Sequence, residues 1–426
     1  MLNEKSEAET AFASLFEARR NDSARDVRER DWRAFLRGGL PNRRNESWHY
    51  TDLRGALRDW TPPQSPSLIE ESPGLSSVAL VCGEGDWSKA PPPSEHYAPA
   101  PGVARRSLSQ ALASLDENLL DALAPRIDDP VLALNGALMS DGVVLEIAPG
   151  AVIDEPIVIE RRFSGAGFSV TRSLVVVGEG ARVTIVERAP SAEGAGGFEN
   201  DALIFVLGPG AVVDHCAVVG ARSERTTSVL SLVASLDAKA ALNSFGLVEG
   251  GGLMRRQIFA RLTGEDASVG FNGVSLLRGK AFTDTTLHVR HEAPNGKSRE
   301  RFRTIVDGDA TGVFQGKVSV AQAAQKTDGA MQSKCLLLSP GASMSNKPEL
   351  EIFADDVLCG HGATCGRLEA EQLFYLMARG LPRAEAEALL IEGFANEAAE
   401  SIEREGLRAS VGERISDWLA GREGKR

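Results

Sequence analysis

Short apolar runs separated by small turn motifs fill the middle of the chain, from about residue 130 to 365. Each unit alternates turn and strand, as in GAVIDEPIVIE and GARVTIVERA. The units recur about every 30 residues. A repeat of that length without intervening helices predicts a solenoid of β coils, in which each coil buries its apolar side against its neighbours. The spacing fails between residues 267 and 310, where we expect an insertion or a longer loop. The regular turns contain Ala151, Ala181, Ala211, Ala238 and Ala267.

Residues 1–60 predict helices, the last of which ends at Gly38 and Gly39. Prolines interrupt residues 61–105, which predicts a loose connector with one strand at Val78–Cys82. A short helix follows the connector. The apolar residues at helical spacing are Ala8, Phe12, Leu15, Phe16, Trp32, Phe35, Leu36, Leu108, Leu112 and Leu115.

Three further helices are predicted from about Glu369 onward, the first of which ends at Gly380 and Pro382. We expect them either to cap the open end of the β stack or to present a surface to a partner. The predicted organisation is a helical region with a connector (1–129), a β core (130–366) and a helical C-terminal domain (367–426). The apolar stripes contain Leu373, Phe374, Leu376, Met377, Ala386, Leu389, Leu390, Phe394, Leu407, Val411, Ile415, Trp418 and Leu419.

Composition and charge limit the partners. The chain has 47 basic and 59 acidic residues, a formal net charge of −12, which disfavours nucleic acid and anionic lipid. No stretch reaches the roughly 18–20 apolar residues of a membrane span, and the N-terminus lacks a secretory pattern. The five cysteines are scattered without framework spacing. We therefore expect a soluble protein of the reducing cytoplasm.

The segment LEIFADDVLCGHGATC, residues 350–365, concentrates metal-binding chemistry. In an extended strand Cys359, His361 and Cys365 share a face, and thiolate and imidazole bind zinc, iron and iron–sulfur species. Asp355 and Asp356 could orient the histidine. The alternative is that the cysteines are small buried residues and that the two intervening glycines form a turn. The spacing C-x-H-x-x-x-C matches no standard zinc motif.

Other motifs point away from catalysis. Residues 312–318 resemble a phosphate-binding loop, but the spacer is one residue short and Val318 replaces the serine or threonine that would hold magnesium. We expect no nucleotide to bind this chain. His288 and His291 flank a polar run that we interpret as a solvated loop or edge. We interpret Cys335 as a core residue.

Four segments together resemble the SufD members of the SufB/SufD family, the scaffold subunits of the Suf iron–sulfur cluster assembly system. The C-terminal matches are KPELEIFADDVLCGHGAT (347–364) and LFYLMARGLPRAEAEALLIEGF (373–394). Upstream, VFQGKVSVAQAAQKTDGAMQSKCLLLSPGA (313–342) and SWHYTDL (47–53) fit the same family. The resemblance implies a right-handed parallel β-helix flanked by N-terminal and C-terminal helical regions, in agreement with the repeat.

The resemblance also implies partners and a cargo. The chain would pair through its β-helix with a SufB-like paralogue, and its C-terminal helices would bind a SufC-like ATPase. His361, with Cys359 beside it, would hold a transient iron–sulfur cluster at the paralogue interface, whereas no role carries over to Cys365. On the helices, Phe374, Tyr375, Arg379 and Phe394 would face the ATPase. The resemblance leaves open a reduced flavin in the complex and a homodimer of the isolated chain.

Two alternatives remain at this point. SufB-like chains share the C-terminal pattern, but they are usually longer and often carry an N-terminal cysteine cluster, whereas Cys82 stands alone here. A carbohydrate-active β-helix lyase would use acidic and basic residues such as Asp307, Asp309, Arg301 and Arg303. Against this, such enzymes are mostly secreted, and aromatic residues make up only 6% of this chain. We expect a non-catalytic scaffold.

Overall fold

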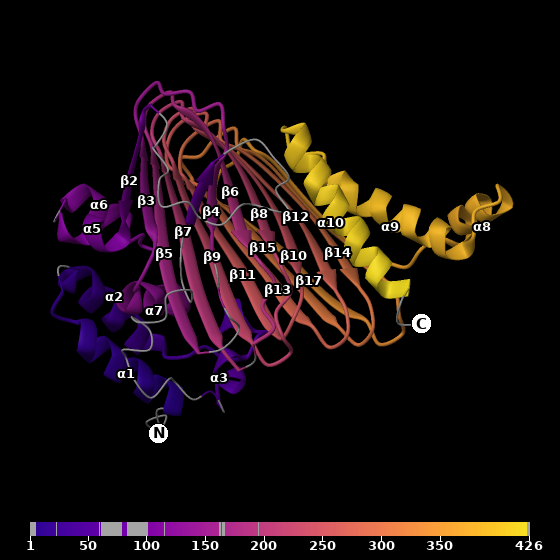
Figure 1. Cartoon of the computed structure of the whole chain (residues 1–426). Coiled ribbons are helices and arrows are strands. Elements are labelled where there is room, and N and C mark those ends of the chain that lie inside the picture. The colour runs from indigo at the N-terminus through magenta and orange to yellow at the C-terminus, as the bar shows by residue number, and fades with distance from the viewer. Residues whose placement is uncertain are drawn as a thin grey trace.

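The computed structural model describes residues 6–423 apart from 23, 59, 61–78, 83–100, 115, 162, 164–166 and 195. Within these residues the chain passes back and forth between two nine-stranded sheets, so strands of the two sheets alternate along the sequence. The predicted β-solenoid is confirmed (Figure 1). The right-handed winding stays a prediction.

Each sheet adds one strand per coil. All neighbouring strands within a sheet are parallel except the pairs β1–β4 and β2–β3 at the first coils, and the strand predicted at Val78–Cys82 appears as β1. Sheet A contains β1 (Ala79–Cys82), β4 (Ile157–Glu160), β6 (Arg182–Ala189), β8 (Val212–Val219), β10 (Ala241–Glu249), β12 (Ser268–Leu277), β14 (Lys297–Val306), β16 (Asp328–Leu337) and β18 (Leu358–Gly366). Sheet B contains β2 (Val103–Ser107), β3 (Val143–Ile147), β5 (Phe168–Val177), β7 (Phe198–Leu207), β9 (Thr227–Leu236), β11 (Leu253–Leu262), β13 (Phe282–His291), β15 (Thr311–Val320) and β17 (Ser343–Ile352).

Alternate residues of each long strand point into the space between the two sheets. Because the register does not slip from coil to coil, these residues stack in straight ladders through the interior. Most strands are covered on both faces, which explains why apolar runs such as LIFVL in β7 are continuous and not alternating. The inner core includes Leu145, Val175, Ile185, Phe205, Leu232, Phe271, Leu287 and Phe314.

The corners of the solenoid explain why the turn spacing fails after residue 267. At the corner before each sheet A strand from β4 to β16, one residue adopts a left-handed conformation, and its amide donates to a carbonyl of the next coil. Glycine occupies this position in the early coils; Lys239, Asp266, Asn295 and Lys326 (φ 59–61°) occupy it later, at intervals of 27, 29 and 31 residues. Ala310 belongs to the opposite corner. The expected insertion is therefore wrong, because two series of turns were merged into one.

The N-terminal helices cover the outer face of sheet B over the first coils (Figure 1). Ser6 and Glu9 form a capping box at the start of α1, and Gly39 (φ 63°) ends α2 as predicted. Leu115 and most of the proline-rich connector lie outside the described residues. The elements are α1 (Glu7–Arg19), α2 (Arg25–Gly38), the 3₁₀ turn η1 (Glu46–Trp48), α3 (Leu53–Ala56), α5 (Leu108–Ala113), α6 (Glu117–Ala122) and α7 (Pro130–Leu138).

The SWHYTDL segment fastens the N-terminal region to the solenoid. Trp48 is fully buried, and the Arg255 guanidinium lies 3.8 Å from the centre of its ring. Arg255 also forms a 2.6 Å ion pair with Asp284, which accepts a 2.5 Å hydrogen bond from Thr51. This segment is thus a structural anchor on strands β11 and β13.

The three predicted C-terminal helices are α8 (Ala370–Ala378), α9 (Arg383–Ala399) and α10 (Glu405–Glu423). Helices α9 and α10 lie on the outer face of sheet A, where Ile391, Ile415 and Trp418 pack with Phe245 and Leu247. Helix α8 extends away from the solenoid (Figure 1). The alternative that these helices cap the open end of the stack is therefore wrong.

Ion pairs reinforce this attachment. Arg303 pairs with Glu397 of α9, and Asp307 pairs with Arg422 of α10, each at 2.7 Å. Arg303 and Asp307 were candidates for the carbohydrate-lyase alternative. Their charges instead hold the C-terminal helices on sheet A.

Candidate functional site

Strand β18 is the last strand of sheet A and carries the predicted ligands. It runs without a break across its glycines and pairs with β16, so that Cys359, His361 and Cys365 lie opposite Gly329, Met331 and Cys335. Met331 and Cys335 are buried in the solenoid interior. The three residues therefore share one face, as the strand pattern predicted, and that face points into the open end of the solenoid, formed by β17 and β18.

Cys359 is half-buried against the inner core. Its neighbour Gly329 lies close to the thiol, because a Cβ atom there would be in van der Waals contact with the sulfur at 3.5 Å. Burial raises the pKa of the Cys359 thiol, and a hydrogen bond with the Gly329 backbone only partly opposes that effect. A metal that binds here must displace a firmly held proton.

His361 lies above Met331 and is exposed. Within the described part of the chain, its ring has no hydrogen-bond partner. An imidazole that makes no internal bond can offer a ring nitrogen to a metal or to a second protein. Asp355 and Asp356, considered as its orienting groups, lie in the preceding turn, where the Asp356 amide donates to Gln325 and its carbonyl accepts from Lys326.

Cys365 lies beside Cys335, a contact that the sequence interpretation missed. The two are paired between β18 and β16, and Asn346 of β17 donates a hydrogen bond to the Cys365 sulfur at 3.2 Å. A signal was present in the sequence, because the two cysteines are 30 residues apart, one full repeat. Cys335 is 2% exposed, as its interpretation as a core residue required.

The described residues contain no group of three or more histidine, cysteine, aspartate or glutamate side chains arranged to hold a metal. Cys359 and His361 share a face two positions apart, but no third ligand joins them within this part of the chain. Structural zinc sites usually have four protein ligands. The two candidate ligands at the open end therefore do not form a complete metal site within the described residues.

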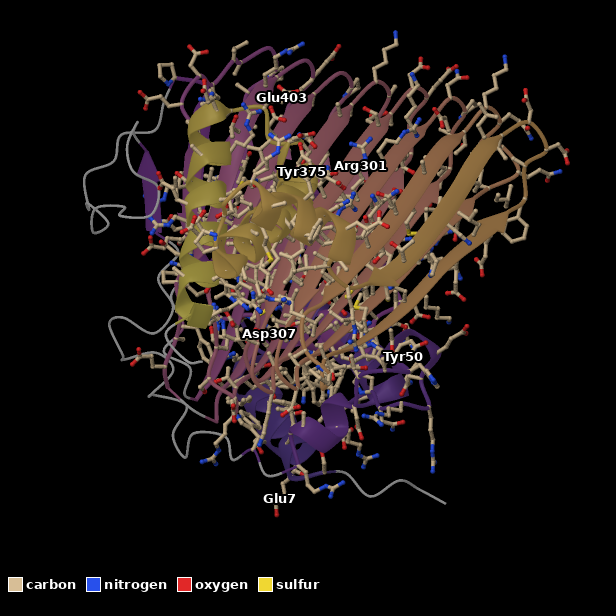
Figure 2. The ribbon with its side chains drawn as sticks, turned by 90° about the vertical axis from the view of Figure 1, so that its right-hand side faces the viewer. Glu7, Tyr50, Arg301, Asp307, Tyr375 and Glu403 are labelled. Carbon is tan, nitrogen blue, oxygen red and sulfur yellow. The ribbon has the colours of Figure 1, made fainter. Side chains whose placement is uncertain are left out.

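The surface of α8 is unusually apolar for an exposed helix. Phe374 is 73% exposed and Tyr375 57%, and the Arg379 guanidinium lies 4.9 Å from the Tyr375 ring centre. Figure 2 shows Tyr375 on the helical layer in front of the strands. Phe394 differs, because it packs toward sheet A with Arg303 5.6 Å from its ring.

The interpretation of the polar run from His288 onward as a solvated loop or edge is wrong. The run forms the end of β13, a tight turn and strand β14. His291 and Glu300 are fully buried inside the solenoid, and burial lowers the pKa of His291 to about 4. The inward face of this segment carries polar residues, so the sequence pattern did not identify it as buried. Similarly, the segment compared with a phosphate-binding loop lies within the continuous strand β15.

A cavity of about 970 Å³ lies elsewhere, between the N-terminal region and the outer face of sheet B. Several of its basic side chains already have acidic partners: Arg255 pairs with Asp284, Lys317 with Glu351, and Lys347 with Glu349. None of the predicted site residues lines it. In the described residues we find no helix both long and apolar enough to cross a membrane.

Comparison with known proteins identifies the family. Residues 161–394 match the SufBD core domain of the SUF system for FeS cluster assembly. The chain is 30% identical to the iron–sulfur cluster assembly protein SufD of Escherichia coli over 91% of both chains. It is 29% identical to a SufBD family protein of Synechocystis (92% of this chain, 90% of the relative) and 26% identical to SufD of Bacillus subtilis (67% and 66%). The chain therefore belongs to the SufBD family of iron–sulfur cluster assembly proteins and is SufD-like.

Proposed function

We propose that this chain is a non-catalytic scaffold subunit on which a nascent iron–sulfur cluster forms between two proteins. His361 and Cys359 would be its contribution to the ligands, and a SufB-like paralogue would supply the rest. One observation carries the proposal: two ligand side chains share the inward face at an uncovered solenoid end, yet the described chain does not complete their ligand set.

The open end favours pairing with another β-sheet protein. Strands β17 and β18 are the terminal strands of sheets B and A, so their outer backbone groups face no further strand within the described chain. Such edges readily accept strands from a second chain. Exposed apolar side chains flank them, namely Ile352, Phe353 and Leu358 at 39%, 68% and 76% exposure. A SufB-like β-helix could continue both sheets, and a second copy of this chain could do so in isolation.

The C-terminal helices would carry the ATPase. Phe374 and Tyr375 offer an exposed apolar surface on α8, which projects away from the solenoid, whereas a role for Phe394 stays a prediction because it packs toward the sheet. Arg303 and Asp307 tie α9 and α10 to sheet A. ATP-driven closure of the ATPase would therefore pull on the solenoid that carries His361. A reduced flavin in the complex also stays a prediction.

The cluster role is tested by co-expressing a tagged chain with its operon and measuring iron and sulfide in the purified complex. His361→Ala should leave the complex intact and lower its iron–sulfur content. Thr364→Ala, on the opposite face of β18, is the matched control and should change nothing. An unchanged iron–sulfur yield in the His361 variant would remove that residue from the site.

Partner assignment needs a separate experiment. Replacing both Phe374 and Tyr375 with alanine should release the ATPase from the purified complex and retain the paralogue. Leu36→Ala, at an exposed apolar position on α2, should retain both. Retention of the ATPase by the double variant, or loss of both partners together, would contradict the assignment of α8.

A further inference from the structure

Cys335 and Cys365 form a sulfur pair at the open end of the solenoid. They are direct partners in the parallel pair β16–β18, so both side chains point inward from adjacent strands. Neighbouring strands lie about 4.8 Å apart, within the roughly 4.4–6.8 Å that separates the Cα atoms of disulfide-bonded cysteines. The spacing of adjacent strands is therefore compatible with a disulfide between the two residues.

The two thiols have different surroundings. Cys335 is 2% exposed, whereas Cys365 is exposed. Burial and the adjacent Cys365 raise the pKa of the Cys335 thiol to about 12. Asn346 donates from its amide nitrogen to the Cys365 sulfur at 3.2 Å, and its amide oxygen accepts from Ser333 at 2.6 Å, which fixes the orientation of the amide. This hydrogen bond orients the Cys365 side chain at the open end.

We propose that Cys335 and Cys365 are a peroxide-oxidised pair that forms a reversible disulfide, with Cys365 as the attacking thiol and Cys335 as the resolving thiol. Cys365 is accessible to the oxidant, and the buried Cys335 lies next to it. This inference goes beyond the scaffold function, since it requires neither a partner nor a cluster.

The chemistry balances with one hydroperoxide. The Cys365 thiolate attacks a peroxide oxygen, the O–O bond breaks, and the leaving hydroxide takes a proton to become water. The resulting sulfenic acid is attacked by the Cys335 sulfur; the S–O bond breaks, the disulfide forms, and a second water leaves with the Cys335 proton. Two thiols are oxidised, and hydrogen peroxide is reduced to two waters.

Cys359 provides an internal control. It is on the same strand and face as Cys365, but its partner on β16 is Gly329. Cys359 therefore has no sulfur opposite it on β16, and it should not form a disulfide although it lies on the same edge as Cys365. The comparison separates the effect of pairing from that of location at the open end.

The test uses the isolated full-length chain, because a protein paired with β18 would cover this edge. The reduced protein is treated with equimolar hydrogen peroxide, and its remaining thiols are alkylated. The chain is then cleaved on the N-terminal side of each aspartate, and disulfide-linked peptides are identified. This cleavage places Cys335 in peptide 328–354 and places both Cys359 and Cys365 in the peptide that begins at Asp356, so the variants decide which of these two sulfurs is linked. We expect one link between the two peptides, and free thiols that fall from five to three per chain and return with dithiothreitol.

Variants identify the sulfurs. The link should disappear in Cys365→Ala and persist in Cys359→Ala. A link that persists in the first variant and disappears in the second would overturn the proposal. So would a linked dimer of chains, or sulfinic acid on Cys365 without any link. Mapping in Cys359→Ala, where Cys365 is the one cysteine left in its peptide, stands even if Cys335→Ala, at a buried position, fails to fold.

Discussion

Replacing Glu300 with glutamine should stabilise the fold, and by more as the pH rises. Glu300 is fully buried in the solenoid interior, stacked between Phe271 of β12 and Met331 of β16. Within the described residues, neither of its carboxyl oxygens has a hydrogen-bond partner. Burial raises the pKa of Glu300 to about 8, and the nearby Ser298 and Arg299 offset only part of that effect. The carboxyl group is therefore neutral in the fold up to about that pH.

The sign of the effect follows from proton binding. Between the ordinary pKa of 4.5 and about 8, the folded chain holds a proton that the unfolded chain has lost, so stability falls as pH rises through this window. One pKa unit corresponds to about 1.4 kcal/mol, so the penalty is near zero at pH 4, about 3 kcal/mol at pH 7 and up to about 5 kcal/mol above pH 8. Glutamine has the same shape and cannot ionise, so its variant lacks this penalty.

Urea unfolding of the wild type and of Glu300→Gln at several pH values between 4 and 9 checks this prediction. The free-energy difference between them should grow with pH in favour of the variant. Glu199→Gln is the matched control, because Glu199 is equally buried but pairs with Arg222 at 3.1 Å, and this pairing helps lower its pKa. That variant should lose stability at neutral pH. A Glu300→Gln difference that does not vary with pH would refute the reasoning.

Four further substitutions test the fold. Lys239→Gly should raise the unfolding temperature, since Lys239 is held at φ 59° and glycine relieves up to about 1 kcal/mol of backbone strain; Asp266→Gly should gain less, because aspartate tolerates this conformation. Ile415→Ala, at a fully buried position on α10 where the helix packs on sheet A, should cost about 2–5 kcal/mol and expose the C-terminal helices to limited proteolysis. Asp284→Asn leaves buried Arg255 without its charged partner, which should lower the urea midpoint by an amount equivalent to about 3–5 kcal/mol; a change below about 1 kcal/mol would contradict this.

The solenoid could be predicted from the sequence because each coil repeats one pattern of turn and strand. Its details were harder to predict, since a coil has two corners with similar turn residues. Ala267 and Ala310 belong to different corners, and only the hydrogen-bonded register separates them. The buried Glu300 and His291 were missed for a related reason. Alternation tells which residues share a face, but it does not tell which face is inside when both faces contain polar residues.

For strand β18, too, local features could be predicted from the sequence and long-range contacts could not. The shared face of Cys359, His361 and Cys365 follows from the period of a strand, so it could be predicted. The pairing of Cys365 with Cys335 depends on register, and it becomes visible only when the 30-residue repeat is applied to the cysteines. Folding alone gives no reason for two candidate ligands and the exposed Phe353 to occupy an edge that the described chain leaves uncovered. An uncovered edge with exposed apolar side chains is unfavourable for a solitary protein and is buried when a second chain pairs with it, which supports our proposal that the site is one side of an interface.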